Sequence, residues 1–177
     1  MESEEAGPVS SNQMVVCNTA DGDIIHVEIE VMNQSQTFKN ATEKPDFAVF
    51  SVQEVKTPVL IKIVDWCRQR IGVPEPVSRV DRRTGERIWF KLTDYEKKFF
   101  RDLPNAELIE VLESAKYLQI ESLYLYSCQT MAYRMKRMDC EEIRQTFGLE
   151  DDLTLKEKAQ IRRKNNGRRA KGGRTIN

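Results

Sequence analysis

The spacing of the hydrophobic residues changes along the chain, and this change limits the folds that the chain can adopt. Between residues 25 and 29, hydrophobic side chains alternate with polar ones, which is typical of a half-buried strand. Over residues 57–70 and 106–119 they recur at every third or fourth position, which is the spacing of amphipathic helices. Strands near the N-terminus followed by a series of helices predict an α+β fold, in which helices cover a small sheet.

Three strands are expected in the N-terminal part, over residues 14–17, 24–29 and 48–52. The Asp21-Gly22 pair predicts a hairpin turn between the first two, because glycine readily adopts the positive φ that such turns need. In the second strand, His26 is expected to face solvent. Residues 33–43 carry one large apolar side chain, Phe38, so any helix there is expected to be short and weakly anchored.

Helices are expected in the rest of the chain, over residues 57–70, 94–102, 106–119, 121–136, 139–147 and 154–166. Thr57 and Asp94 are expected to cap the first two, and Asp139 and Thr154 each begin a capping box with a glutamate three residues later. The last two helices are expected to end at glycines, Gly148 and Gly167.

The charge is balanced overall but unevenly distributed. Seven of the 28 Lys and Arg residues lie within residues 162–177, which contain no acidic residue. The rest of the chain therefore has 21 basic and 28 acidic residues. We expect residues 1–13 to be a disordered leader and 167–177 to be a disordered basic tail. A nuclear-import signal or contact with nucleic acid remains open for the tail, although nucleic acid is not favoured because no aromatic residue is interleaved.

Residues 72–92 are expected to form an exposed linker, because prolines, glycines and four arginines break any periodicity. No stretch is long and apolar enough to span a bilayer, and the acidic start does not resemble a secretory signal. The protein is therefore expected in the cytoplasm, the nucleus or both, with no membrane partner.

The motifs of common enzymes are missing. The only histidine is His26, and the four cysteines are widely spaced, so no metal site and no catalytic residues are predicted. No glycine-rich loop follows a strand, and no cofactor or small-molecule substrate is expected. Each cysteine is instead expected to be structural or buried. The sequence therefore predicts a protein that is not an enzyme.

The helices after residue 121 are short, and their apolar residues come late in the chain. Short helices are stable only when they pack against something, so these residues predict a partner surface. Packing against the protein's own sheet remains the alternative.

Four stretches appear in the order and spacing of the Skp family, namely DGDIIHVEIEV, TPVLIKIVDWC, LIEVLESAKYLQIESLYLYSC and CEEIRQTFGLEDDLTLKEKAQIRRKN. The chain resembles this family, which links F-box proteins to cullins in SCF-type ubiquitin ligases. The resemblance implies a BTB/POZ-like domain over residues 14–126, with the linker inside it, and a helical F-box-binding extension over 127–166. The implied function is a non-catalytic adaptor in ubiquitin-dependent protein degradation.

The resemblance also implies two binding surfaces. The cullin-binding residues would be Lys116, Tyr117 and Glu113. The F-box-binding residues would be apolar positions of the late helices, namely Cys128, Met131, Met135, Ile143, Phe147, Leu149 and Ile161.

Three departures from the family pattern suggest a diverged paralogue. Lys116 stands where the family usually has Asn, and Gly167 stands where the family has a Trp that packs on the F-box. The linker is arginine-rich where the family's is commonly acidic. These departures leave two alternatives to the adaptor, namely an F-box-binding partner that no longer docks a cullin and a basic-tailed nuclear interaction protein.

Overall fold

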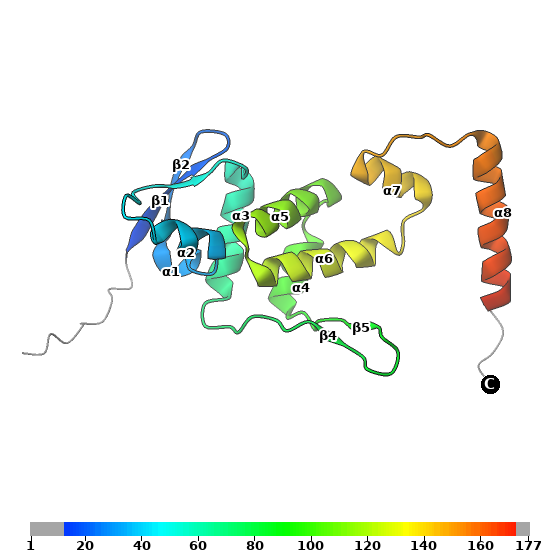
Figure 1. Ribbon diagram of the computed structural model, residues 1–177, viewed down its shortest axis with the longest axis horizontal. Helices are drawn as coiled ribbons and strands as arrows, with labels where there is room; N and C mark the ends of the chain where they lie inside the picture. The colour runs from blue at the N-terminus through cyan, green and yellow to red at the C-terminus, as the bar shows by residue number, and fades with distance from the viewer. Residues whose placement is uncertain (1–12, 173–177) are drawn as a thin grey trace, which may run out of the picture. The chain divides into compact units, whose positions relative to one another are not determined.

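The structure is a computed structural model that describes the chain over residues 13–172 and its side chains through residue 164. The chain divides into two compact units between Arg137 and Met138, called here the N-terminal unit and the C-terminal unit (Figure 1). Residues 1–12 of the predicted leader and 173–177 of the predicted tail lie outside the described part. No described helix is both long and apolar enough to cross a bilayer.

The sheet of the N-terminal unit contains β1 (Met14–Thr19), β2 (Ile24–Glu28) and β3 (Phe50–Val52) in the order β2-β1-β3. β1 and β2 form the predicted antiparallel hairpin, and Gly22 in its turn has a φ of 84°. β3 pairs in parallel with β1, which the sequence did not indicate. His26 is exposed, as expected.

Two short helices follow the hairpin, α1 (Ile29–Met32) and α2 (Gln36–Thr42). The weak anchoring expected of this segment is wrong, because Phe38 is completely buried and packs edge-on against Phe50, with ring centroids 5.1 Å apart. The Ser35 hydroxyl caps α2 by accepting from the Phe38 amide, and it donates to the Leu118 carbonyl over 2.6 Å. These distant partners anchor α2 and could not be inferred from its own sequence.

Helix α3 (Thr57–Gln69) has Lys56 at its N-cap, where the sequence predicted Thr57. Thr57 is not the cap, because its amide and hydroxyl both donate to the Asp21 carboxylate, over 3.0 and 2.8 Å. The turn of the β1–β2 hairpin therefore supplies an acceptor to the start of α3. This contact holds the sheet against the helix.

The segment after α3 contains a small antiparallel hairpin that was not predicted, formed by β4 (Arg79–Val80) and β5 (Arg87–Ile88). Figure 1 shows it projecting from the body of the N-terminal unit as a green loop. Between Gly72 and Ile88 every residue except Pro76 is exposed.

Three longer helices complete the unit, α4 (Asp94–Arg101), α5 (Asn105–Leu118) and α6 (Glu121–Met135). Thr93 rather than Asp94 caps α4, through a capping box with Glu96. Apolar residues at helical spacing form one face of α5, of which Leu108, Val111, Ala115 and Leu118 are buried and Leu112 is half-buried. The predicted domain boundary between residues 126 and 127 falls inside α6, and it stays a prediction.

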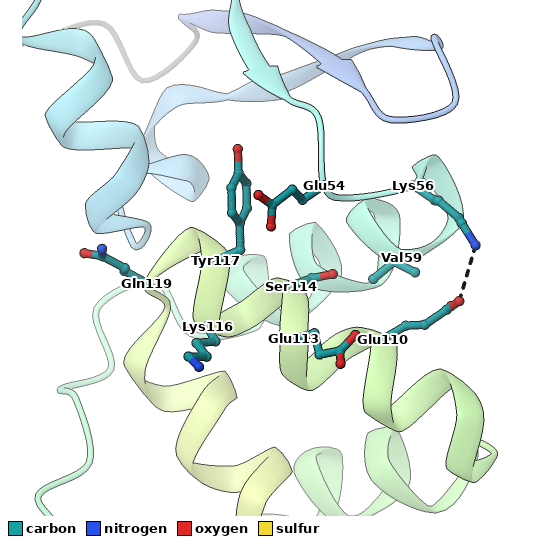
Figure 2. A pocket seen from close by; sticks show the side chains of 9 residues that line it. All are labelled: Glu54, Lys56, Val59, Glu110, Glu113, Ser114, Lys116, Tyr117 and Gln119. Carbon is teal, nitrogen blue, oxygen red and sulfur yellow. Dashed lines mark hydrogen bonds and ion pairs between the residues drawn. The ribbon is translucent and has the colours of Figure 1, made fainter. Parts of the chain in front are cut away.

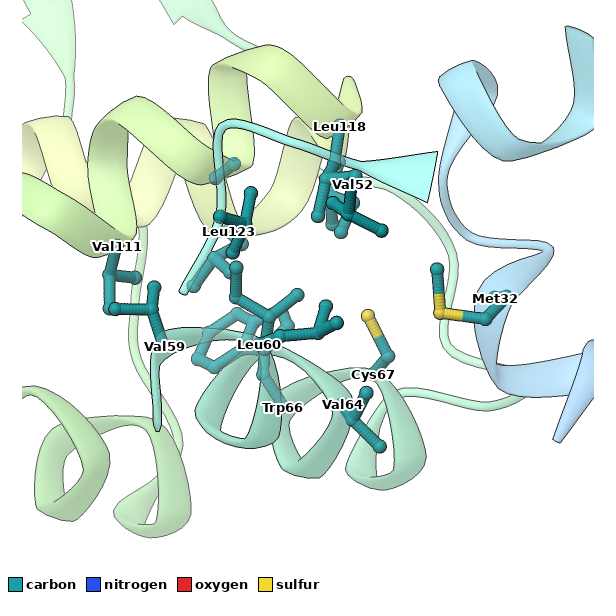
Figure 3. Packing of buried hydrophobic residues seen from close by; sticks show 14 of the residues in the cluster. Met32, Val52, Val59, Leu60, Val64, Trp66, Cys67, Val111, Leu118 and Leu123 are labelled. Atoms are coloured by element: carbon teal, nitrogen blue, oxygen red, sulfur yellow. The ribbon is translucent and has the colours of Figure 1, made fainter. Parts of the chain in front are cut away.

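The hydrophobic core lies where α3, α5 and α6 meet the sheet (Figure 3). Trp66 is completely buried at its centre, and the ring centroids of Phe100 and Tyr126 lie 5.4 and 5.8 Å away. Cys17 and Cys67 are buried in this core, as expected. The core thus fixes α5 and α6 rigidly enough to position side chains on their outer faces.

The C-terminal unit contains α7 (Cys140–Phe147) and α8 (Leu155–Gly172). Asp139 caps α7 through the predicted capping box, and α7 ends at Gly148, which has a φ of 62°. The Thr154 hydroxyl accepts from the Glu157 amide at the start of α8, as predicted. The predicted end of α8 at Gly167 is wrong, because the helix continues to Gly172.

Candidate functional site

A hollow of about 700 Å³ lies beside the C-terminal half of α5 (Figure 2). Its lining comes from α5, from the start of α3 and from the loop after β3, namely Glu54, Lys56, Val59, Glu110, Glu113, Ser114, Lys116, Tyr117 and Gln119. The structure therefore brings together all three residues for which the sequence predicted cullin binding. We call this surface the α5 hollow.

Tyr117 is held firmly in the α5 hollow. Its backbone carbonyl accepts a hydrogen bond from the Thr37 hydroxyl over 2.8 Å, and the ring is half-buried. Figure 2 shows Glu54 beside the ring, and burial together with this carboxylate raises the pKa of the Tyr117 phenol. The helix ends two residues later at Gln119, whose left-handed φ of 54° turns the chain toward α6. The phenol thus stays protonated and able to form hydrogen bonds at neutral pH.

Charged side chains also line the α5 hollow. Lys116 and Glu113 are exposed on α5, and Lys56 forms an exposed ion pair of 3.5 Å with Glu110. An exposed pair of this kind contributes little to stability, so its charges remain available to a partner. The α5 hollow therefore combines one aromatic anchor with a polar rim, which is typical of a protein interface.

The predicted F-box residues on α6 differ in accessibility. Cys128 and Met135 are half-buried, whereas Met131 is only 5% exposed and belongs to the core. Met131 thus packs inside the N-terminal unit.

The predicted F-box residues of the C-terminal unit are all accessible, and α7 buries none of its side chains. Ile143 and Ile161 meet in a hollow of about 840 Å³ between α7 and α8. Phe147 and Leu149 are 37% and 56% exposed and do not line this hollow.

Two apolar residues of this hollow were missed by the sequence reasoning, Met138 and Leu153. Leu153 directly precedes the cap residue Thr154, and an apolar residue at this position commonly packs against the first turn of the helix. That pattern could have identified it. Met138 lies in the loop between α6 and α7 and has no apolar neighbours at a regular spacing, so no local pattern indicated it.

An ion cluster connects the two helices of the C-terminal unit. The Asp151 carboxylate accepts from both Arg144 of α7 and Lys158 of α8, and Arg144 also pairs with Glu141 over 2.7 Å. These hydrogen bonds hold the pKa of Asp151 well below its usual range. The cluster therefore crosses the loop that separates α7 from α8.

The four cysteines differ in burial. Burial raises the pKa of the Cys17 thiol to about 11 and that of Cys67 to about 12, so both stay protonated at neutral pH. Cys140, which was expected to be structural or buried, is exposed because α7 buries none of its side chains. Among the described side chains, no three His, Cys, Asp or Glu residues are arranged to hold a metal ion.

Comparison with known proteins gives matches along most of the chain. Two family models match it, the Skp1 family tetramerisation domain at residues 13–71 and the Skp1 family dimerisation domain at residues 121–167. SKP1-like protein 12 from Arabidopsis thaliana is 32% identical over 157 residues, which cover 88% of this chain and 96% of that relative. The chain belongs to the Skp1 family. The predicted family and the BTB/POZ-like α+β fold are thus confirmed.

Two further relatives are named as parts of an SCF ubiquitin ligase complex. The E3 ubiquitin ligase complex SCF subunit sconC from Arthroderma otae is 30% identical over 158 residues, covering 88% of this chain and 94% of the relative. The SCF ubiquitin ligase complex protein SKP1b from Dictyostelium discoideum is 30% identical over 162 residues, covering 90% and 98%. These relatives match over nearly their full length, so the chain has the domain content of whole Skp1 family proteins.

Proposed function

We propose that this Skp1 family member is a non-catalytic adaptor that joins a cullin to F-box substrate receptors in an SCF-type E3 ubiquitin ligase. The observation that carries the proposal is the presence of both family domains in one chain, in relatives named as SCF subunits. The chain would support ubiquitin-dependent degradation in the cytoplasm, the nucleus or both.

The cullin would dock at the α5 hollow. Tyr117 offers a half-buried aromatic ring, and its backbone carbonyl is hydrogen-bonded to Thr37 of α2. Lys116 and Glu113 supply exposed charges in the same hollow. Preorganised aromatic anchors with polar rims are the usual centres of binding energy at interfaces.

F-box motifs would dock on the exposed apolar residues of α7 and α8 in the C-terminal unit. In the N-terminal unit, the half-buried Cys128 and Met135 of α6 would be F-box-binding residues of their own. Phe147 is 37% exposed in the free chain, and burying a side chain of its size contributes roughly 1.5 to 3 kcal/mol. Loss of this contact alone would weaken an F-box complex about tenfold or more.

The adaptor role requires no bond chemistry from this chain. It would act by holding the substrate receptor near the other subunits, which carry out ubiquitin transfer, because proximity lowers the entropic cost of that transfer.

Two substitutions test whether the surfaces are separate. Tyr117→Ala should weaken capture of a cullin about tenfold or more while F-box binding is unchanged, and Phe147→Asp should do the reverse. Co-purification with a purified cullin N-terminal region and with an F-box protein, followed by titration calorimetry, measures both effects.

Tyr117→Phe is the matched control, because it keeps the ring and removes only the hydroxyl. If either Tyr117→Ala or Phe147→Asp abolished both interactions while circular dichroism showed a folded chain, the proposal of two separate surfaces would fail.

The exposed Lys116 favours a second candidate, an F-box-binding partner that no longer docks a cullin. A long cation in place of the family's short amide changes the hydrogen bonds available in the α5 hollow. A panel of cullins distinguishes the candidates: if none binds the natural chain and Lys116→Asn restores binding, the second candidate holds.

A further inference from the structure

The hairpin of β4 and β5 carries cations that the proposed adaptor surfaces do not use. Arg79 and Arg87 lie on the paired strands, and Arg82 and Arg83 lie in the turn between them. All four residues are exposed. Among the residues with described side chains, none of the four forms an ion pair.

The two acids of the hairpin do not neutralise these arginines. The Asp81 carboxylate accepts from the backbone amides of Arg83 and Thr84, over 2.8 and 3.1 Å, so it serves to close the turn. Glu86 is the only other acid between residues 79 and 88. The hairpin therefore has a net positive charge within a body that is acidic overall.

Apolar side chains alternate with the arginines. Val80 lies opposite Arg87 across the two strands, and Ile88 lies opposite Arg79, so each face of the hairpin pairs one arginine with one aliphatic residue. Val80 and Ile88 are 56% and 49% exposed. Each face could thus contact a carboxylate and an apolar group side by side.

The base of the hairpin is fixed to α6. The Gln129 amide donates to the Phe90 carbonyl over 2.9 Å and accepts from the Phe90 amide over 2.8 Å. The adjacent Trp89 ring lies against Tyr133 with centroids 5.5 Å apart, and the Lys136 ammonium lies 5.1 Å from the Trp89 ring. This arrangement continues the cationic surface from the hairpin onto the end of α6.

We propose that the β4–β5 hairpin together with Trp89, Tyr133 and Lys136, called here the hairpin surface, docks an acidic segment of a partner protein in which carboxylates alternate with aliphatic residues. Guanidinium groups bind carboxylates in a bidentate manner, and the exposed Val80 and Ile88 supply the apolar contacts. The proposal does not depend on the adaptor function.

Charge distribution favours an acidic peptide over nucleic acid. Outside residues 162–177 the chain has 21 basic and 28 acidic residues, so a long polyanion that extended beyond the hairpin surface would be repelled. Lys136 also lies over both Trp89 and Tyr133, which leaves these rings poorly placed to stack with bases.

Fluorescence anisotropy with the full chain tests the proposal. The probe is a labelled peptide of about twelve residues that alternates glutamate and leucine, and the comparison peptide of equal charge alternates glutamate and glycine. The hairpin variant is Arg79→Glu with Arg87→Glu. The control variant is Lys39→Glu with Lys44→Glu, which makes the same change of charge at exposed positions of the N-terminal unit away from the hairpin.

The glutamate-leucine peptide should bind the natural chain at least about tenfold more tightly than it binds the hairpin variant, and the control variant should bind like the natural chain. Equal binding of the two peptides would overturn the proposal, because it would show only a general attraction of charge. Equal weakening by both variants or no binding at all would also overturn it. So would tighter binding of a twenty-base single-stranded oligonucleotide that is lost in the hairpin variant, because only such binding would depend on the hairpin and not on the basic tail.

Discussion

Arg70 lies at the C-terminal end of α3, and its side chain is almost completely buried. It forms a 2.6 Å ion pair with Glu96, which is equally buried, and it donates to the Pro74 carbonyl over 3.1 Å. The guanidinium also lies 5.6 Å from the Trp66 ring and 5.4 Å from Tyr126. One side chain thus joins α3, the linker, α4 and α6.

Removing one member of a buried ion pair is costly, because the remaining charge keeps its desolvation penalty and loses its partner. We expect Arg70→Met to lower the free energy of unfolding by about 3 to 5 kcal/mol, measured by urea denaturation. Arg101→Met is the control, because the pair of Arg101 with Asp102 is exposed and should contribute less than about 1 kcal/mol. Similar losses for the two variants would contradict the role given to Arg70.

At the scale of elements, short-range caps decide where the helices of the C-terminal unit begin. Asp139 accepts from the amides of Glu141 and Glu142, both over 2.8 Å, and the Glu142 carboxylate accepts from the Asp139 amide. All partners lie within three residues, so the sequence alone was sufficient to place the start of α7.

Asp139→Ala should destabilise α7 by about 0.5 to 2 kcal/mol, because two amides of its first turn lose their acceptor. Asp139→Asn is the matched control, since asparagine keeps the acceptor and changes only the charge. Hydrogen exchange of the α7 amides measures the effect. Equal protection of α7 in the alanine and asparagine variants would show that the cap is not what holds the helix.

At the scale of the whole molecule, carboxylates join the β1–β2 hairpin to α3. Hydrogen bonds from Thr19 and Thr57 lower the pKa of Asp21 from 3.8 to about 2, and a hydrogen bond from Arg68 lowers the pKa of Glu28. Because these pKa values are lower in the folded state than in the unfolded state, the stabilisation is complete above the unfolded pKa. It is lost as the pH falls toward the folded pKa.

We therefore expect the free energy of unfolding to decrease as the pH is lowered from about 5 to about 2. Asp21→Asn should make this decrease shallower, because it removes one of the groups that must take up a proton. Urea denaturation at a series of pH values measures the slope. Asp46→Asn is the charge-matched control, at an exposed position in the same unit. A slope for Asp21→Asn equal to that of the control would refute the assignment.

In the candidate sites, some features follow from local sequence and others depend on residues that are distant in the chain. The sequence placed Lys116, Tyr117 and Glu113 on one helix, and the structure adds the loop residue Glu54 that lies beside the phenol. The sequence also predicted that Met131 contacts a partner, whereas the structure buries this side chain in the core. Helical spacing predicts which residues share a face of a helix. It does not predict how deeply neighbouring elements bury each of those residues.

The sequence by itself determined the order of β1 to β3 and of α3 to α8, the β1–β2 hairpin, the apolar face of α5, and the caps of α7 and α8. Each of these depends on residues that are close in the chain. Only the tertiary structure decided that β3 runs parallel to β1, that Phe38 is buried, and that Asp21 supplies the acceptor for Thr57. These features depend on partners far apart in sequence, whose approach is set by the packing of the whole core and by no local pattern.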